Sequence, residues 1–460
     1  MTPITGTPIV TAAQMRAAEA EAIANGASVE TLMARAGQGV AAAVGRLGAG
    51  APVLVLCGPG NNGGDGYVAA TALAAMGLNV RVAALAEPTT DAARSARTGW
   101  AGPVETIDDA RPAPILLDAL FGTGLSRGLD ARLASRLSAL ANSARLAIAV
   151  DLPSGIATDD GRLLSPVPDF DVTLALGAAK PAHLLQPGAR CCGAVRLIDI
   201  GVTAATDAAV LARPSLSAPG PDSHKYNRGM VVVIGGAMAG AALLASTAAM
   251  RAGAGYVALL DGGAGGPHAL VHRMMDDQPL DDDRIGALLV GPGLGRTAES
   301  AAKLDKALAS ERPLIVDGDA LHLLKERIEC VQRRRAPTIL TPHQGEFVAL
   351  FGEGKGSKLD RARDAARRAA AVIVYKGADT VIAGTDGRAR LAGDANDWLS
   401  TAGTGDVLAG VIAATLAAGL DPLDAAAAGV WMHGAAARRL GAAFIADDLA
   451  DALSAVRASL

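Results

Sequence analysis

The chain has 460 residues and a formal net charge of −4, and half of its residues are hydrophobic although only 3% are aromatic. A chain of this length can form two or more domains, whose cores must be built mainly from Ala, Val, Leu and Ile. The charge balance excludes a basic nucleic-acid surface and a polybasic membrane patch, and no apolar run reaches the roughly 18 residues of a membrane span.

The first half alternates apolar runs with helical stretches. Helices are predicted over about 11–24, 64–76 and 129–142. Strands are predicted at 52–57, 79–85, 114–118, 145–150, 171–176 and 194–199. Continuous apolar strands separated by helices predict a parallel sheet that is covered on both faces.

A segment rich in Pro, Ser and Gly, 213–229, interrupts this alternation and is interpreted as a linker and domain entry. Strands then resume at 230–234, 255–260, 286–290, 313–317, 337–341, 371–376 and 379–383, and an Ala-rich helical tail is predicted over about 404–456. The predicted fold class is therefore α/β, with two tandem domains over 1–212 and 230–460.

The loop GPGNNGGDG (58–66) follows the first strand, and its first six residues satisfy G-x-G-x-x-G. Between a strand and a helix this pattern is the fingerprint of dinucleotide-binding folds. A dehydrogenase would also need an acidic residue at the end of the next strand, and Glu87 is available. That interpretation leaves Asn61, Asn62 and Asp65 unexplained.

Two further strand ends carry polar loops, DALFGTGLSRG (118–128) and DLPSG (151–155). Because the carboxyl ends of parallel strands share one edge of a sheet, the three loops should converge. Asn62, Asp118 and Ser154 could offer three oxygens to a hard cation there. Backbone N–H groups of the second loop could hold phosphates, with Arg127 adding charge. The alternative is that the aspartates cap helices and Ser154 belongs to a turn.

These three motifs, at these separations, resemble the NAD(P)H-hydrate epimerase family over roughly residues 8–210. The resemblance implies a Rossmann-like three-layer fold that inverts C6 of hydrated NADH or NADPH, with Asp151 as the acid or base. It implies a potassium ion bound by Asn62, Asp118 and Ser154. It also implies contacts to the hydrate from Asp151 and from Asn61, Asn62, Gly63, Gly64, Asp65, Gly122, Thr123, Gly124, Leu125, Ser126, Arg127 and Gly128.

Lys180 falls where that family carries a Lys-Pro pair near the site. The family commonly follows the pair with Gly, whereas this chain has Ala182 and His183. The role of Lys180 therefore stays open, and we interpret His183 as a loop residue peculiar to this chain rather than as a catalyst.

The strand ends of the second half are also polar. They carry Gly235-Gly236, GPGLG (291–295), DGDAL (317–321), TPHQGE (341–346), KGADT (376–380) and AGTGD (402–406). The last opens a long apolar helix, whose N–H groups and positive dipole end form an anion site. Asp406 there could accept a hydroxyl proton during phosphoryl transfer, or could merely charge the helix start.

Other residues of these loops allow two interpretations each. We favour a ligand contact for His343, although a lone histidine in a loop is usually structural. Glu346 is either a metal ligand or support, or a charge in the first helical turn. Asp317 and Asp319 fit either loop structure or a site, and Lys376 either pairs with nucleotide phosphates or is an exposed lysine.

As a set, KYNRGMVVVIGG, GPGLG, DGDAL, TPHQGE, YKGADT and TAGTGDVLAG resemble the ADP-dependent NAD(P)H-hydrate dehydratase family, of ribokinase-like fold, over roughly residues 222–458. The resemblance implies that ADP phosphorylates the C6 hydroxyl and that phosphate then leaves, giving NAD(P)H and AMP, with Asp406 as base and Mg²⁺ bridging phosphates. It implies that the hydrate is contacted by Ala241, Gly293, His343 and Asp406, and the nucleotide by Lys376, Gly377, Ala378, Asp379, Thr380 and Gly405.

Both halves thus point to a bifunctional metabolite repair enzyme that uses K⁺, Mg²⁺ and ADP. Three alternatives stay open: a ribokinase-like kinase with a regulatory first domain, an NAD-dependent dehydrogenase, and a dinucleotide sensor without catalysis in the first half. The four cysteines match neither a zinc site nor a disulfide framework, and a signal peptide is not expected. We expect a cytoplasmic homo-oligomer whose partners are small molecules, with neither nucleic acid nor membrane among them.

Overall fold

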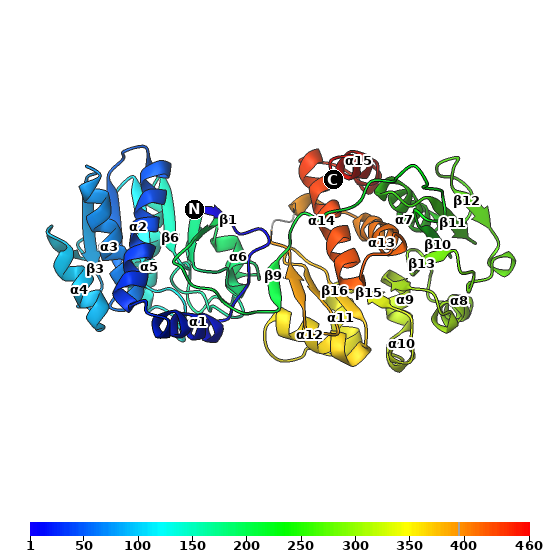
Figure 1. The fold of residues 1–460 in the computed structure, drawn as a ribbon, viewed down its shortest axis with the longest axis horizontal. Coiled ribbons are helices and arrows are strands. Elements are labelled where there is room, and N and C mark those ends of the chain that lie inside the picture. Colours follow the sequence, from blue (N-terminus) through cyan, green and yellow to red (C-terminus); the bar gives the residue numbers. More distant parts are fainter. Residues whose placement is uncertain (394–395) are drawn as a thin grey trace. The chain divides into compact units, whose positions relative to one another are not determined.

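The computed structural model describes residues 1–393 and 396–460, which form two compact units, Met1–Val210 and Leu211–Leu460. Each unit contains a mainly parallel sheet with helices packed on it (Figure 1). The predicted α/β class is confirmed for both halves. Within the described chain, residues 211–229 form neither helix nor strand.

The sheet of the first unit has the order β1-β8-β7-β6-β5-β2-β3-β4, parallel except for the edge strand β1. The strands of this unit are β1 (Thr2–Pro3), β2 (Val53–Cys57), β3 (Val80–Ala84), β4 (Val104–Thr106), β5 (Ile115–Ala119), β6 (Leu146–Val150), β7 (Val172–Leu176), β8 (Ala194–Ile198) and β9 (Ala208–Val210). The helices are α1 (Ala12–Ala24), α2 (Val29–Gly48), α3 (Asn61–Ala75), α4 (Asp91–Gly99), α5 (Ala131–Ser143), the 3₁₀ turn η1 (Pro181–His183) and α6 (Gly188–Cys191).

Strand β2 shows why this sheet is covered on both faces. All five of its side chains are buried. Val53, Val55 and Cys57 belong to an apolar cluster with α2 and α3, whereas Leu54 and Leu56 belong to a second cluster with α5. Successive side chains of a strand point to opposite faces, so a continuous apolar strand requires a helical layer on each side.

The sheet of the second unit runs β12-β11-β10-β13-β14-β15-β16-β17-β18, parallel up to β16 and antiparallel beyond it. Its strands are β10 (Met230–Ile234), β11 (Tyr256–Leu260), β12 (Val271–Arg273), β13 (Ile285–Val290), β14 (Leu314–Val316), β15 (Thr338–Leu340), β16 (Val372–Tyr375), β17 (Val381–Ala383) and β18 (Ala389–Leu391). Its helices are α7 (Ala239–Ala252), η2 (Met275–Asp277), α8 (Ala298–Ala309), α9 (Gly318–Leu323), α10 (Glu329–Gln332), α11 (Gln344–Phe351), α12 (Lys358–Ala369), η3 (Asp397–Leu399), α13 (Thr404–Ala417), α14 (Pro422–Leu440) and α15 (Ala446–Ala458).

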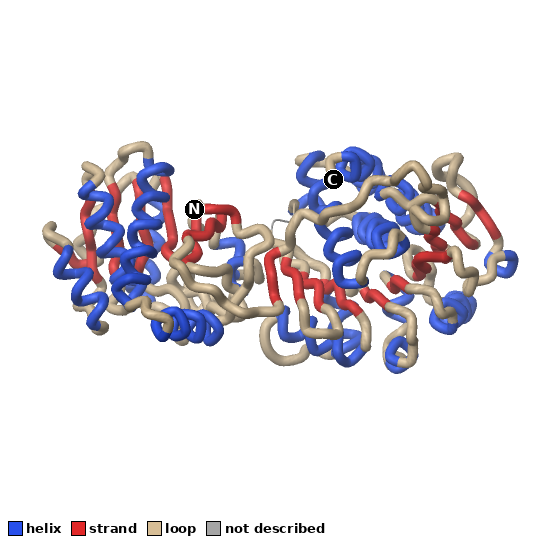
Figure 2. The backbone as a smooth tube through the Cα atoms, viewed as in Figure 1, coloured by secondary structure: helices blue, strands red, loops and turns tan. Residues whose placement is uncertain are grey.

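Helices α7, α13, α14 and α15 share one apolar cluster with the sheet of this unit, and α11 and α12 lie on the opposite side of the sheet (Figures 1 and 2). Small residues let α7 and α13 pack closely. A Cβ at Gly410 would lie only 2.1 Å from the carbonyl oxygen of Ala245. The Ala and Gly richness of the sequence therefore serves close helix packing.

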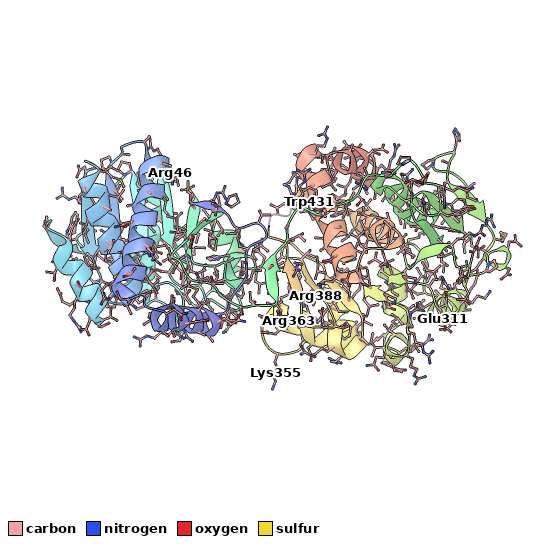
Figure 3. The ribbon with its side chains drawn as sticks, viewed as in Figure 1. Arg46, Glu311, Lys355, Arg363, Arg388 and Trp431 are labelled. Atoms are coloured by element: carbon pink, nitrogen blue, oxygen red, sulfur yellow. The ribbon has the colours of Figure 1, made fainter. Side chains whose placement is uncertain are left out.

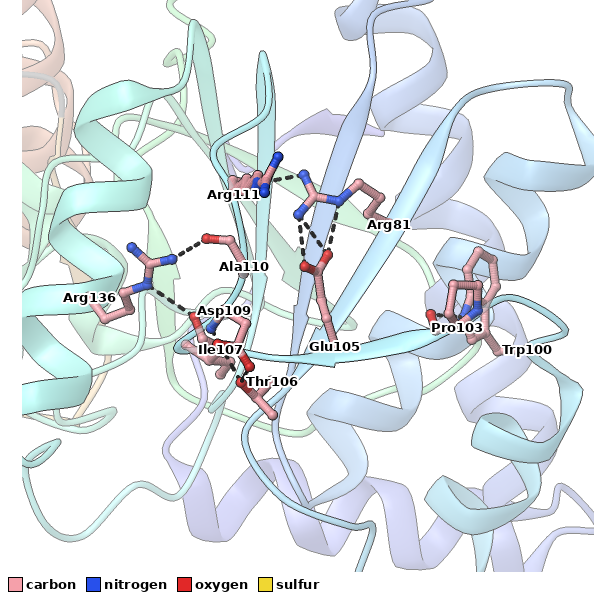
Figure 4. Close-up of polar contacts among 10 residues, drawn as sticks. All are labelled: Arg81, Trp100, Pro103, Glu105, Thr106, Ile107, Asp109, Ala110, Arg111 and Arg136. Atoms are coloured by element: carbon pink, nitrogen blue, oxygen red, sulfur yellow. Dashed lines mark hydrogen bonds and ion pairs between the residues drawn. The ribbon is translucent and has the colours of Figure 1, made fainter.

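Arginine side chains tie the edges of both sheets. Arg81 of β3 grips Glu105 of β4 through two hydrogen bonds of 2.9 Å (Figure 4). The paired contact of Arg81 with Glu105 holds β3 and β4 in register. Two arginines of the second unit, Arg363 and Arg388, are labelled in Figure 3. Arg363 of α12 donates to the carbonyl of Gly387 at 2.9 Å, and Arg388 pairs with Asp386 in the same turn.

The structure differs from the sequence prediction in several elements. Helices α2 and α4 were not predicted, and the helical tail is three helices, separated at 418–421 and 441–445. Helix α3 begins at Asn61 rather than near 64, so the asparagines lie in its first turn and not in a loop. None of the described helices is long and apolar enough to cross a membrane.

Candidate active sites

The first site centres on Asp151, which follows β6 directly. Its φ is 65°, in the left-handed region that residues other than Gly rarely adopt. Its side chain is almost wholly buried. Strained backbone of this kind persists only where the surroundings hold it, and it is frequent at active sites.

The Asp151 carboxylate is held by Lys180, by Thr123 and by the backbone N–H of Leu176, which donates to Oδ1 at 3.3 Å. Lys180, which is 1% exposed, forms an ion pair with Oδ1, while Thr123 donates to Oδ2 from its backbone N–H at 2.9 Å and from its hydroxyl at 2.6 Å. Burial alone would raise the pKa of Asp151, but the ammonium of Lys180 and the bond from Thr123 outweigh it and lower the pKa. The site therefore holds Asp151 as a carboxylate, and Lys180, whose role the sequence left open, is its counter-ion.

His183 contacts both Asp151 and Lys180. Its Nε2 lies 2.7 Å from the carbonyl oxygen of Asp151, and its Nδ1 accepts the backbone N–H of Lys180 at 2.9 Å. Burial, followed by the charge of Lys180, lowers the pKa of His183 to about 4. The ring is therefore neutral near pH 7 with its proton on Nε2. Interpreting His183 as an incidental loop residue missed this contact, which its spacing of three from Lys180 in η1 makes possible.

The loops predicted to converge do so. A Cβ at Gly122 would lie 2.8 Å from Oδ1 of Asn62 and 3.0 Å from Oδ2 of Asp151. The buried Nδ2 of Asn62 has no hydrogen-bond partner within the described chain. Such an orphaned donor marks a place where a ligand acceptor fits.

Asp65 lies one turn after Asn62 on α3 and is also buried. Burial raises its pKa well above the ordinary value, and the carboxylates of Asp151 and of Glu19 on α1 raise it further. The site thus contains two carboxyl groups with pKa values shifted in opposite directions, as acid and base pairs commonly are.

Asp118 and Ser154 form a buried polar pair behind this site. Oδ1 of Asp118 accepts the Ser154 hydroxyl at 2.8 Å and Oδ2 accepts the Ser154 N–H at 2.9 Å, while the hydroxyl oxygen accepts the N–H of Phe121 at 2.9 Å. Burial outweighs these bonds and raises the pKa of Asp118 to about 6. Within the described chain Asp118 has no basic partner.

The other predicted substrate contacts differ in their surroundings. Asn61 and Gly63 lie in the first turn of α3, which has no side-chain cap, so their N–H groups can face an anion, whereas the N–H of Gly64 donates to the carbonyl of Gly60 at 3.1 Å. Gly124 and Leu125 line a cavity of about 350 Å³ together with Arg16 of α1, and Ser126 and Arg127 are exposed. Gly128 has a packing reason instead, because a Cβ there would lie 2.1 Å from the carbonyl oxygen of Leu164.

The second site lies at the carboxyl ends of β14, β15 and β16. Lys376 pairs with Asp317 at 2.7 Å, and Thr341 donates its hydroxyl to the same oxygen of Asp317 at 2.6 Å. The N–H of Lys376 also donates to the carbonyl of Pro342 at 2.9 Å. Lys376 is therefore neither an exposed lysine nor unpaired. Its pKa is raised because the charge of Asp317, and then that of Glu346, outweighs burial.

Asp406 lies in the first turn of α13, which begins after Gly403 (φ 88°). A Cβ at Gly405 would lie 3.5 Å from the ammonium nitrogen of Lys376. Burial and the charge of Asp317 raise the pKa of Asp406 to about 7, although Lys376 opposes the shift. A carboxyl group poised at this pKa is suited to accept a proton near neutral pH.

Buried His433 of α14 lies next to this turn, with Nε2 2.9 Å from the carbonyl oxygen of Thr404. Burial lowers the pKa of His433 to about 4, so the ring is neutral and Nε2 donates.

By contrast, His343 is largely exposed and caps α11 through its Nδ1, with Glu346 completing the capping box. The cap is a structural role that accounts for both His343 and Glu346. Nε2 of His343 lies 3.4 Å from Oε1 of Glu346.

Ala241 and Gly293 adjoin each other, since a Cβ at Gly293 would lie 3.0 Å from the Cβ of Ala241. The predicted nucleotide loop, 376–380, is bent by hydrogen bonds between Gly377 and Thr380. Lys358 supports this loop, pairing with Asp379 at 2.5 Å and with its ammonium 4.5 Å from the centre of the Tyr375 ring. Sequence reasoning did not identify Lys358, which comes from α12.

Comparison with known proteins gives matches in both units. Residues 231–457 match the family model described as NAD(P)H-hydrate dehydratase, and residues 29–182 match the one described as YjeF-related protein N-terminus. The bifunctional NAD(P)H-hydrate repair enzyme Nnr of Salinibacter ruber is 37% identical over 98% of this chain and 96% of its own. That of Thermofilum pendens is 36% identical over 89% of this chain and 87% of its own. A crystal structure of ADP/ATP-dependent NAD(P)H-hydrate dehydratase from Bacillus subtilis, co-crystallised with ATP/Mg²⁺, is 30% identical over 53% of this chain and 94% of its own, with a TM-score of 0.45.

Proposed function

The chain belongs to the family of bifunctional NAD(P)H-hydrate repair enzymes, and from this we propose that its first domain interconverts the R and S hydrates at Asp151 and its second dehydrates the S hydrate at Asp406. The observation that supports the proposal most strongly is the opposite tuning of the carboxyl groups. Asp151 has a lowered pKa, whereas Asp65 beside it and Asp406 in the second site have raised ones.

Epimerisation at C6 requires that the hydroxyl leaves and returns on the other face. The hydroxyl leaves as water only with an added proton, which protonated Asp65 can donate. The cation left behind on the nicotinamide ring is stabilised by the Asp151 carboxylate, which Lys180 and Thr123 keep charged and oriented. When water adds back to C6 of this cation, it gives up one proton to a carboxylate of the site.

A potassium ion fits the oxygens behind this site. Asp118 is a buried carboxylate without a basic partner in the described chain, and a cation would compensate its charge. Asn62, Asp118 and Ser154 offer amide, carboxylate and serine oxygens, the hard donors that such a cation prefers. The ion would organise the loops that carry Asn62 and Asp151.

In the second domain Asp406 accepts the proton of the C6 hydroxyl of the hydrate. The oxygen of that hydroxyl attacks the outer phosphorus of ADP, and AMP is released. Phosphate then leaves C6 with the electrons of the C–O bond, and loss of a proton from the neighbouring C5 to solvent restores the ring double bond of NAD(P)H. The described residues contain no cluster of three or more His, Cys, Asp or Glu side chains that could hold a metal ion. Mg²⁺ would accordingly bind through the nucleotide phosphates, whose charge it neutralises.

A coupled assay tests both roles. The protein receives mixed R and S hydrates of NADH with ADP, Mg²⁺ and K⁺, and the absorbance of reduced nicotinamide is followed. The wild type should convert both hydrates, Asp151→Asn only the S form beyond spontaneous epimerisation, and Asp406→Asn neither. Complete recovery at the wild-type rate by either variant contradicts the role of that aspartate.

A further inference from the structure

One short segment, 180–183, contacts Asp151 at two separate places. The ammonium of Lys180 pairs with the carboxylate of Asp151, and the ring of His183 meets its carbonyl oxygen at 2.7 Å. The same ring accepts the Lys180 N–H at 2.9 Å, which fixes the segment itself. All three residues are buried, so water cannot replace these bonds.

The carbonyl contact matters because of the backbone conformation of Asp151. Two peptide planes flank its Cα. The first is held by the bond from the Asp151 N–H to the carbonyl of Leu174 at 2.8 Å. The second is held locally by the N–H of Leu152, 2.8 Å from the carbonyl of Val150, and from a distant segment by His183. Fixing both planes keeps the residue at a φ of 65°, from which it would otherwise relax.

We propose that His183 is a positioning residue of the epimerase site, which holds the Asp151 carboxylate in place through the hydrogen bond from Nε2 to the Asp151 carbonyl. Lys180 and Thr123 set the direction of the carboxylate, and His183 sets the backbone from which it projects. No proton transfer by His183 is involved, since Nδ1 accepts a backbone bond and Nε2 donates one. The inference rests on the proposed role of Asp151.

Two variants separate the two bonds of the ring. His183→Gln places an amide nitrogen near the position of Nε2 and keeps the bond to Asp151. His183→Asn places an amide oxygen near the position of Nδ1, so it keeps the bond from Lys180 but cannot reach the Asp151 carbonyl. Both remove the aromatic ring, which makes them matched for packing loss. The dehydratase activity of the same chain is an internal control.

The R and S hydrates are separated chromatographically, and initial epimerisation rates are measured over a range of substrate concentrations. His183→Asn should lower kcat by about tenfold or more while KM changes less than about threefold, because a misplaced carboxylate affects the reaction more than binding. His183→Gln should keep kcat within about threefold of the wild type, and dehydration should be unchanged in both.

A wild-type kcat in His183→Asn, or equal losses in the two variants, overturns the inference. If His183→Asn loses the unfolding transition of the first domain while dehydration stays intact, this domain does not fold in that variant. In that case His183→Gln is decisive: a kcat within about threefold of the wild type supports the inference, and a larger loss contradicts it. Asp151→Asn, assayed in parallel, distinguishes the two levels of failure. An active Asp151→Asn contradicts the proposed function, whereas an inactive one beside a fully active His183→Asn contradicts only the role of His183.

Discussion

The ammonium nitrogen of Lys376 lies 2.7 Å from Oδ1 of Asp317, so this lysine pairs with a buried carboxylate rather than with Asp406. Asp317 thereby orients Lys376 at the N-terminus of α13, and its charge also helps to keep the pKa of Asp406 near 7. A base with this pKa is half ionised near neutral pH, and only its ionised form can accept a proton.

The pH dependence of dehydration should follow Asp406. In the wild type, kcat/KM for the S hydrate should rise with pH around a midpoint of about 7. In Asp317→Asn the midpoint should move to lower pH, because a neighbouring negative charge is removed and Lys376 is freed to face Asp406. The measurement is kcat/KM from pH 5 to 9 on the isolated S hydrate. A midpoint that stays in place or moves upward contradicts this electrostatic picture.

Replacing Lys180 by Met should damage stability and epimerisation together. The Asp151 carboxylate would lose its counter-ion inside the protein, which typically costs about 3–5 kcal/mol. The pKa of Asp151 should rise, since Lys180 contributes most among the groups that lower it. Urea unfolding should show the loss in the transition of the first domain, and epimerisation should fall. Lys358→Met, which breaks the ion pair with Asp379 in the second domain, is the matched control and should leave epimerisation intact.

Potassium should be needed for epimerisation. Initial rates measured with K⁺ replaced by a bulky organic cation should fall, because Asp118 would be buried without compensation. Asp118→Asn removes the charge and should abolish the dependence of the rate on K⁺. A wild-type epimerisation rate that is the same with and without K⁺ would contradict the proposal that the site binds potassium.

The glycines of the G-x-G-x-x-G pattern should respond differently to alanine. A Cβ at Gly58 would lie 1.8 Å from the carbonyl oxygen of Leu120, and one at Gly63 would lie 1.8 Å from that of Gly58. Both substitutions should destabilise the first domain by about 1–3 kcal/mol or more, as overpacking does. Gly60→Ala is the control, because nothing lies within 4 Å of its Cβ position and its φ is −94°. Thermal unfolding of the three variants checks the ranking, and equal losses would contradict it.

The central strands and most strand-end loops could be predicted, because a continuous apolar run fits few positions in a layered fold other than a buried strand. The short strands β1, β4, β9, β12 and β18 were not predicted. Strands β2, β5 and β6 lie within one or two residues of their predicted ranges. Helix α2 was not predicted, although its buried residues Leu32, Ala36, Val40 and Val44 repeat with helical spacing. The start of α3 was misplaced because Asn and Gly usually mark loops, yet here an uncapped helix starts on them.

The convergence of Asn62, Gly122 and Asp151 also followed from the sequence, because parallel strands bring their carboxyl ends to one edge. The ionisation of the carboxyl groups in the two sites could not be predicted from the sequence. Whether Asp151 is a carboxylate depends on Lys180, 29 residues away. The raised pKa of Asp406 depends on burial and then on Asp317, which is far along the chain. The contact of His183 with Asp151 could not be predicted for the same reason, since the carbonyl it meets lies 32 residues earlier.

The residue pattern alone therefore predicted two α/β domains and their strand-end loops, and the family resemblance added the pair of aspartates on which we base the proposed reactions. Tertiary structure decided which carboxyl groups are ionised, which lysine pairs with which acid, and which glycines serve packing rather than a ligand. These properties depend on burial and on distances between segments remote in sequence, because desolvation and charge pairing set a pKa and neither is a property of a local motif.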